Sequence, residues 1–222
     1  MPKDRLLFEK TGRARYISHL DLMRTFQRAF LRADIPIKHT EGFNPHAFIS
    51  IALPLSLGFS SGCEILEFGL LEGTAHGDVP ARLNAVLPEG VRVMECYSGE
   101  RPLKELMALE YVVTLEEVVN KNALVEAWSG AMSRKSWVVE KKSKKAKSGV
   151  TTLDMAPLIK GFAFTGIETG GVLLTCVLAA QNPGLNPSVM VNALTDEFPD
   201  LKPGFITYHR AKVFDGAGKE FR

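Results

Sequence analysis

Apolar and polar residues alternate along several short stretches of the chain, and elsewhere the apolar residues recur at the spacing of a helix. Residues 5–9 alternate with a period of two, which predicts a first strand. Over residues 19–33 the apolar positions follow the helical period, and the segment stops before Pro36. Ser18, with Asp21 three residues later, is typical of a helix start. We therefore expect an amphipathic helix soon after the first strand.

The same patterns predict four more elements in the first half of the chain. Strands are expected over residues 48–53, 63–70 and 91–96. A second helix is expected from about residue 78 to 87, with Pro80 in its first turn. The order of elements in this half is therefore strand, helix, strand, strand, helix, strand.

A similar order recurs in the second half of the chain. Asn120 or Asn122 can cap a helix that runs to about Met132, and another helix is expected from Asn186 to about Phe198. The predicted strands of this half cover residues 109–115, 137–141, 162–167, 172–180 and 205–213.

Two units of this order are typical of tandem ferredoxin-like folds, in which an antiparallel sheet carries two helices on one face. We therefore expect a protein of the α+β class built from two ferredoxin-like (βαββαβ) units. The first unit is expected over residues 1–104 and the second over residues 105–222.

The net charge is only +2, but the charged residues are unevenly distributed. Residues 1–38 hold nine Lys or Arg against four acids, and residues 134–160 hold eight against two. Residues 41–100 hold eight acids against two arginines. Two basic regions of this kind favour a polyanion or an acidic partner, although solvated surface explains many such patterns.

Three arginines recur at every fourth residue of the first predicted helix, on the side opposite its apolar face. A basic turn precedes them. Cations in such a row offer several phosphate contacts within a few turns of helix. A solvated helix face, with Asp21 and Asp34 as counterions, is the alternative. The candidate phosphate-binding residues are Lys10, Arg13 and Arg15 in the turn and Arg24, Arg28 and Arg32 in the helix.

Two further segments carry candidate RNA-binding residues. The lysine-rich residues 141–149 are expected to form an exposed hairpin turn or loop, which either holds phosphates or only keeps the chain soluble. One face of the last strand combines an aromatic ring with cations, which suits stacked single-stranded RNA or packing against the other half. The candidates are Lys142, Lys144 and Lys145 in the loop and Tyr208, Arg210 and Lys212 on the strand.

The segment GFNPH, residues 42–46, is rich in turn residues and is a candidate binding loop. Phe43 and Asn44 are candidates for contact with a base or a partner, and His46 for contact with a phosphate. The alternative is a structural turn with Phe43 in the core.

Catalytic and metal-binding signals are weak. His19, beside Ser18 and Asp21, or His46 could act as a general acid or base in a ribonuclease, although a histidine in the first turn of a helix is more often a surface group. His39 and His46 have no evident third metal ligand. We therefore predict no catalytic residue, no metal and no cofactor.

The cysteines and the longest apolar stretch argue against two further classes of protein, those with a cysteine-bound metal or redox site and those with a membrane-spanning helix. The three cysteines, Cys63, Cys96 and Cys176, lack the spacing of a zinc, redox or iron–sulfur motif and are expected to be buried apolar side chains. The longest apolar stretch, residues 172–180, is far shorter than the roughly 20 residues of a membrane-spanning helix. Without an apolar signal region, the expectation is a cytoplasmic protein that does not enter a membrane.

Four segments within residues 5–70 carry a resemblance to a known family: FEKTG at 8–12, YISHLDLMR at 16–24, GFNPH at 42–46 and ALPLSLG at 52–58. They resemble the radical-SAM-linked domain of unknown function, a bacterial module fused to, or encoded beside, a radical SAM protein. Beyond residue 70 the resemblance is weaker and is limited to residues 152–159 and 184–187. The chain departs from the family pattern at Ser56, where a proline is usual, and at Ala156, where a basic residue is usual.

This resemblance implies a radical SAM protein as a separate partner and an RNA as a second one, since family members tend to lie near genes for ribosomal proteins and ribonucleases. The tandem fold and basic first helix also have a distant topological similarity to the RAMP-type proteins that process CRISPR RNA. Topology alone carries little functional weight.

The leading hypothesis is a non-catalytic RNA-binding or scaffold partner of a radical SAM enzyme, in tRNA or rRNA modification. A metal-independent RNA endonuclease of RAMP type is one alternative. A protein–protein interaction domain that does not bind RNA, with its acidic residues 41–100 against a basic partner, is the other. The sequence does not determine the oligomeric state.

Overall fold

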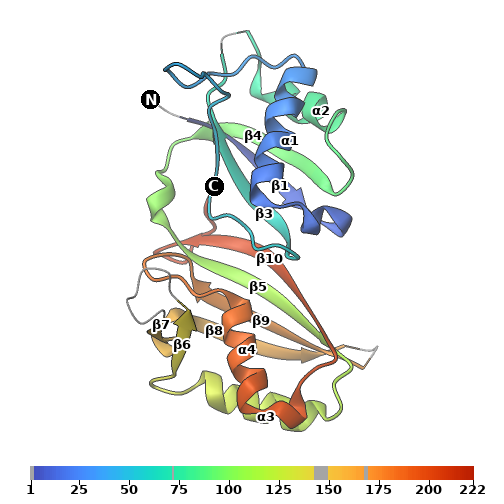
Figure 1. The fold of residues 1–222 in the computed structure, drawn as a ribbon, viewed down its shortest axis with the longest axis vertical. Coiled ribbons are helices and arrows are strands. Elements are labelled where there is room, and N and C mark those ends of the chain that lie inside the picture. Colours follow the sequence, from blue (N-terminus) through green and yellow to red (C-terminus); the bar gives the residue numbers. More distant parts are fainter. Residues whose placement is uncertain (1–2, 72, 143–149, 168–169) are drawn as a thin grey trace. The chain divides into compact units, whose positions relative to one another are not determined.

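A computed structural model of the chain describes residues 3–71, 73–142, 150–167 and 170–222 (Figure 1). Within these residues four α-helices accompany a large, mostly antiparallel sheet, which confirms the α+β class. The chain divides into two compact units. Unit 1 comprises Met1–Glu105, His209–Lys212 and Arg222, and unit 2 comprises Leu106–Tyr208 and Val213–Phe221.

The described part of unit 1 contains four strands in the order β4-β1-β3-β2, and every neighbouring pair in this order is antiparallel. In the same unit, His209 and Arg210 pair in parallel with Ser60 and Ser61. The strands and helices are β1 (Lys3–Lys10), α1 (His19–Arg32), β2 (Ile49–Ile51), β3 (Ser60–Phe68), α2 (Val79–Asn84) and β4 (Val91–Gly99).

The core of unit 1 lies between α1, α2 and one face of the strands, because both helices cover the same face (Figure 1). Phe26 of α1 packs edge-on against Phe8 of β1, with ring centroids 4.8 Å apart. Phe30 packs against Phe68 of β3 at 4.9 Å. These four rings are fully buried and account for much of the apolar surface removed from water in this unit.

The predicted elements of unit 1 are present, with shorter bounds in two places. The strand expected over residues 48–53 is limited to β2, because the chain turns at Leu53, which has a φ of 47°. The helix expected over residues 78–87 is limited to α2, which follows a short 3-10 helix, His76–Asp78. A local pattern shows where an element lies better than where its hydrogen bonds end.

Unit 2 has the strand order β10-β5-β9-β8, and a separate two-stranded sheet joins β6 and β7. Strand β10 contributes residues to both units. The strands and helices are β5 (Leu106–Glu116), α3 (Lys121–Met132), β6 (Val138–Lys142), β7 (Val150–Asp154), β8 (Ile159–Gly166), β9 (Val172–Ala179), α4 (Pro187–Glu197) and β10 (Phe205–Asp215).

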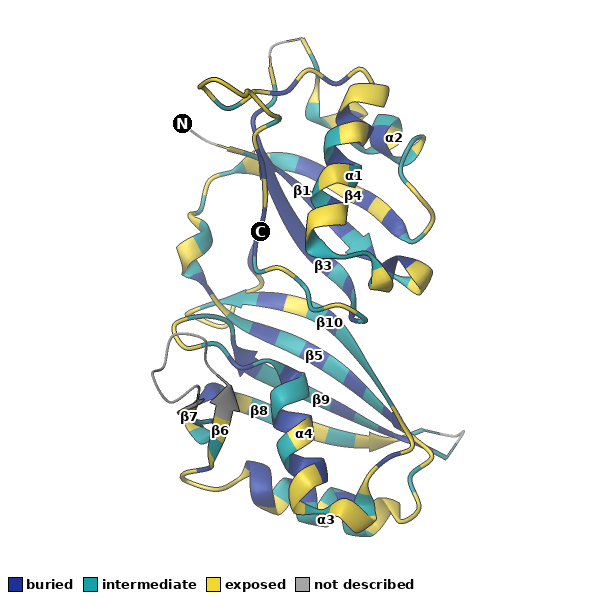
Figure 2. Cartoon of the chain, viewed as in Figure 1, coloured by how far each residue is buried: buried dark blue, intermediate teal, exposed yellow. Residues whose placement is uncertain are grey.

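The core of unit 2 follows the predicted alternation. Every second residue of β5 from Leu109 to Leu115 is buried, as the alternating colours of this strand in Figure 2 show. Trp128 of α3 is fully buried. Of the two proposed caps, Asn120 is the one used: its side chain accepts a hydrogen bond from the backbone N–H of Ala123. Strand β7 was not predicted, because the adjoining lysine run indicated only a turn or loop.

Unit 1 also buries charged side chains. The guanidinium of Arg5 and the ammonium of Lys3 both donate to the carboxylate of Glu67, each at 2.9 Å, and Arg5 and Glu67 are buried. Burial alone would raise the pKa of Glu67, but the hydrogen bonds from Lys3 and Arg5 hold it below its ordinary value. The ionised carboxylate therefore contributes to the stability of the fold.

Among the residues that the structure describes, no helix combines the length and the apolar character needed to cross a membrane.

Replacing Glu67 with Gln should lower the free energy of unfolding at pH 7 by about 3 kcal/mol, because it removes one charge of a buried pair. A carboxylate whose pKa falls on folding stabilises the fold above its ordinary pKa of about 4.3, and this contribution is lost as the pH drops through the folded value. The wild type should therefore lose more stability than the variant between about pH 5 and pH 3 in urea unfolding.

Glu95→Gln is the matched control, because the ion pair of Glu95 with Arg222 is exposed. It should change the stability by no more than about 1 kcal/mol. Curves for wild type and Glu67→Gln that stay parallel over the whole pH range would show that the Glu67 carboxylate contributes nothing specific.

Candidate nucleic-acid interface

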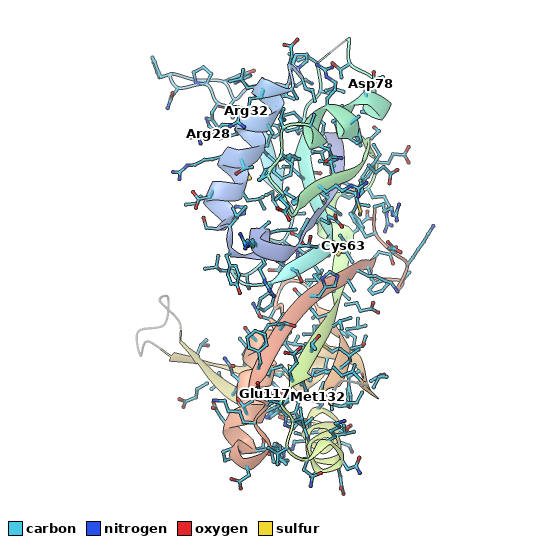
Figure 3. The ribbon with its side chains drawn as sticks, turned by 90° about the vertical axis from the view of Figure 1, so that its right-hand side faces the viewer. Arg28, Arg32, Cys63, Asp78, Glu117 and Met132 are labelled. Atoms are coloured by element: carbon cyan, nitrogen blue, oxygen red, sulfur yellow. The ribbon has the colours of Figure 1, made fainter. Side chains whose placement is uncertain are left out.

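Helix α1 presents three arginines to solvent, because its other face is fixed in the core. Leu22, Phe26, Ala29 and Phe30 are the buried residues of α1, as the helical period predicts. The arginines lie on the remaining side of the helix, away from the strands, as Figure 3 shows for Arg28 and Arg32. Successive arginines are one turn apart, roughly 6 Å along the axis. The exposed row consists of Arg24, Arg28 and Arg32.

The three arginines differ in their partners. Arg24 donates to the carboxylate of Asp21 at 3.2 Å, and Asp21 also accepts from the Ser18 hydroxyl at 2.7 Å. The Ser18 hydrogen bond, with a smaller contribution from Arg24, lowers the pKa of Asp21. Arg28 and Arg32 form no ion pair with any described residue. The proposed counterion Asp34 therefore does not neutralise this end of the row.

The C-terminal end of α1 is held by an arginine from α2. The Arg82 guanidinium donates to the carbonyl oxygen of Ala33, at 2.7 Å from Nη2, and also to the carbonyl oxygen of Asp34. Asp34 itself has a φ of 53°, which ends the helix. A cation that donates to the last carbonyls satisfies groups a helix leaves open and interacts favourably with the helix dipole.

Two depressions in the surface share Arg28. The larger one, which we call the apolar cavity, has a volume of about 520 Å³ and lies at the C-terminal end of α1. The smaller one, the arginine hollow, has a volume of about 280 Å³ and is lined by Arg28 and Arg32 with Thr25, Val86 and Pro88. The apolar cavity is lined by Gln27, Arg28, Phe30, Leu31, Asp34, Ile35, Pro36, Ile37, His39, His46, Ala47 and Leu71.

Residues 39–47 form a short hairpin beside the apolar cavity. His39 and Ala47 form an antiparallel bridge, and the N–H of Thr40 donates to the carbonyl oxygen of His46 at 2.8 Å. Phe43 lies at the tip and is fully exposed, and Asn44 is exposed. The alternative that places Phe43 in the core is therefore wrong, because the bridge turns the tip outward. The loop residues Asn44 and His46 are open to a ligand.

The basic turn contributes less than its sequence indicates. Lys10 is only 2% exposed, and its ammonium donates to the carbonyl oxygens of Ile17 at 2.8 Å and Arg15 at 3.3 Å. Burial lowers the pKa of Lys10, against an opposing effect of Glu64. The assignment of Lys10 to phosphate binding is therefore wrong: the ammonium holds the turn together. Arg13 is exposed.

Arg15 is half-buried, with its guanidinium 5.3 Å from the ring centre of Tyr16. The guanidinium therefore has a neighbour within the protein. Phosphate contact by Arg13 and Arg15 stays a prediction.

The lysine-rich segment lies mostly outside the described residues. Lys144 and Lys145 belong to residues 143–149, which the structure does not describe. Lys142 is the last residue of β6, and its backbone pairs with that of Val150. The assignment of these lysines to RNA binding stays a prediction.

The prediction that the last strand carries an RNA-binding face is wrong for Arg210. Its guanidinium is buried and donates to the Glu64 carboxylate at 2.9 Å and to the carbonyl oxygen of Leu53 at 2.8 Å. Both partners belong to unit 1, as Arg210 does. Tyr208 is half-buried, and burial, with a smaller effect of Cys176, raises its pKa to about 12. Arg210 is therefore a structural residue.

The two candidate catalytic histidines do not meet. His19 is the first residue of α1, and His46 lines the apolar cavity at the other end of that helix. Fourteen residues of helix separate the two ends by about 20 Å. The pair therefore does not form a single acid–base site.

Metal-ligand and cysteine chemistry find little support in the described residues. No group of three or more His, Cys, Asp or Glu side chains lies close enough there to hold a metal ion. Cys63, Cys96 and Cys176 are all buried, as expected. Burial is the main cause that raises the pKa of both Cys96 and Cys176 to about 12, so these thiols stay protonated and unreactive.

Sequence reasoning missed two residues at the end of α1. Leu31 is 82% exposed and lines the apolar cavity. The sequence does indicate this residue, because the helical period places a leucine at position 31 outside the apolar face of the predicted helix. Arg82 gave no comparable signal, since its partners are backbone carbonyls almost fifty residues earlier in the chain.

The chain matches one protein family. The family described as "Uncharacterized protein conserved in bacteria (DUF2344)" matches residues 3–187. No curated protein matches the chain.

Solved structures show a likeness of fold. A chain of "Crystal Structure of a Cbf5-Nop10-Gar1 Complex" aligns with a TM-score of 0.52 and 8% identity, over 95% of this chain and 48% of that one. A chain of "Structure of H/ACA RNP bound to a substrate RNA containing 2'-deoxyuridine" aligns with a TM-score of 0.46 and 9% identity, over 98% and 48%. This protein thus spans about half the length of either chain, and at 8% identity the first likeness concerns the fold alone.

Replacing Arg82 with Met should lower the free energy of unfolding by about 2 kcal/mol, because charged hydrogen bonds to the last carbonyls of α1 are lost. Urea unfolding followed by circular dichroism measures the change. Arg92→Met is the matched control, since Arg92 is an exposed arginine of β4 with no ion pair to a described residue, and it should cost no more than about 0.5 kcal/mol. Equal stability of the two variants would show that Arg82 does not hold the end of α1.

Proposed function

The chain belongs to the DUF2344 family of uncharacterized bacterial proteins, and we propose that its function is to bind RNA, tRNA or rRNA, through the exposed arginines of α1. One observation carries this proposal. Arg28 and Arg32 are exposed, lie one turn apart, line the same hollow and have no carboxylate partner among the described residues.

The chemistry of these arginines suits a phosphate. A guanidinium is always charged and presents its N–H groups in a plane, which matches two oxygens of one phosphate. Guanidinium groups that the fold itself uses, such as those of Arg5, Arg82 and Arg210, are already occupied by carboxylates or carbonyls. Arg28 and Arg32 have no such role, so their charges are available to an external anion.

We place this RNA-binding protein beside a radical SAM enzyme, as a subunit without catalysis of its own. The resemblance of residues 5–70 to the radical-SAM-linked domain supports the partner. The separation of His19 from His46 supports a binding role rather than an acid–base role. The partner would modify the RNA that this chain holds.

We also propose that both units are ferredoxin-like. The strand orders β4-β1-β3-β2 and β10-β5-β9-β8 are the same arrangement when each unit is numbered from its own first strand. In this interpretation, β6 and β7 are an insertion between the first helix and the second strand of unit 2. The proposed units correspond to residues 1–104 and 105–222.

Replacing Arg24, Arg28 and Arg32 together with Glu should weaken binding to a labelled tRNA or rRNA hairpin and leave the fold intact. Surface substitutions cost within about 0.5 kcal/mol each, whereas three lost phosphate contacts remove roughly 2 from the log–log salt slope for single strands. Fluorescence anisotropy at several salt concentrations measures both the affinity and the slope.

The matched control replaces Lys121, Lys135 and Lys202 with Glu, which changes the net charge equally. These lysines are exposed, lie in unit 2 and have no ion pair with a described residue. The control should retain most of the affinity and slope. If both triple variants lose affinity equally, the effect is one of net charge, and α1 is not the RNA-binding face.

A further inference from the structure

We propose that the apolar cavity at the C-terminal end of α1 binds one unpaired nucleotide of an RNA, with the base inside the cavity and its phosphate in the arginine hollow. This inference rests on the proposed RNA-binding function. It adds a site, a ligand class and an orientation that the arginine row alone does not provide.

The size and floor of the cavity suit a nucleobase. Its volume of about 520 Å³ lies within the range of about 300–1,000 Å³ typical of small-ligand sites. Phe30, Ile35 and Ile37 are buried and supply apolar lining, and the exposed side chain of Leu31 borders the same space. A flat aromatic base gains free energy by packing its face on such side chains.

The polar groups at the rim suit the edge of a base. Nδ1 of His39 lies 3.1 Å from the carbonyl oxygen of Ile37, and because a carbonyl oxygen only accepts, Nδ1 is the donor in this contact. Nδ1 of His46 lies 3.0 Å from the hydroxyl of Thr40 and 3.3 Å from the carbonyl oxygen of Asn44. Nε2 of each ring has no partner among the described residues and can meet the edge of a base.

One acidic residue fixes the orientation of the nucleotide. Asp34 lines the apolar cavity, and a carboxylate there disfavours a phosphate but accepts hydrogen bonds from an amino group of a base. The arginine hollow contains Arg28 and Arg32 and no acid among the described residues that line it. Because Arg28 lines both depressions, a nucleotide that bridges them has its base beside Asp34 and its phosphate beside the two guanidiniums.

The exposed tip of the hairpin supports an RNA ligand over a free mononucleotide. Phe43 is fully exposed on the same short hairpin that carries His39 and His46. An aromatic ring in this place offers a stacking surface to a second base, next to the one inside the cavity. A base that is already stacked and paired in a duplex cannot enter the cavity, so the ligand must be an unpaired or extruded nucleotide.

Two RNA hairpins that differ only in one bulged 2-aminopurine nucleotide test this site. The wild type should bind the bulged hairpin about tenfold more tightly than the paired one, in line with the stacking of one base. It should also change the 2-aminopurine fluorescence. Leu31→Gln should abolish the preference for the bulge without changing affinity for the paired hairpin, because Leu31 lines the cavity and not the arginine hollow.

Leu20→Gln is the matched control, because Leu20 is a 66% exposed leucine of the same helix that does not line the cavity. It should keep the full preference for the bulge. Equal binding of both hairpins by the wild type, or equal behaviour of the two leucine variants, would overturn the nucleotide site. Binding of the paired hairpin that still depends on Arg28 and Arg32 would then leave the proposed function standing, whereas binding of neither hairpin would overturn both.

Discussion

The packing of α1 on β1 and β3 is the interaction on which the rest of unit 1 depends. Phe26 meets Phe8 and Phe30 meets Phe68, and these ring contacts fix the rotation of the helix about its axis. Once one face is fixed, the 3.6-residue period determines the direction of every other side chain. The arginine row faces outward for this reason, and Phe30 lines the apolar cavity while it also belongs to the core.

Local patterns predicted what depends on neighbours in the sequence. The bounds of α1, the Ser18 cap and the outward arginines all follow from period and capping, which act over a few residues. The burial of Arg210 does not, because its guanidinium is held by Glu64, which lies 146 residues earlier. The Lys10 ammonium is held by the backbone carbonyls of Arg15 and Ile17, and the residue types at these positions do not indicate such a contact. The sequence does not predict the apolar cavity either, because its lining combines residues of α1, a hairpin and Leu71.

The structure separates two uses of a cation that look identical in a sequence. Arg5 and Arg210 lie in the interior, where an ion pair compensates for lost hydration, and loss of either partner would leave an uncompensated charge. Arg28 and Arg32 keep their hydration and have no internal partner among the described residues. The positive charge of the first 38 residues is therefore divided between maintaining the fold and a surface free to meet an anion.

The attachment of α2 to the end of α1 has a consequence for recognition. Arg82 holds the carbonyls of Ala33 and Asp34, so the helical turn that carries Leu31 is prevented from fraying. The wall of the apolar cavity is then preorganised, and little conformational entropy is lost when a ligand enters. Apparent affinity scales with the fraction of molecules in the competent state, so weakening these hydrogen bonds would loosen binding in the apolar cavity, although Arg82 itself does not line it.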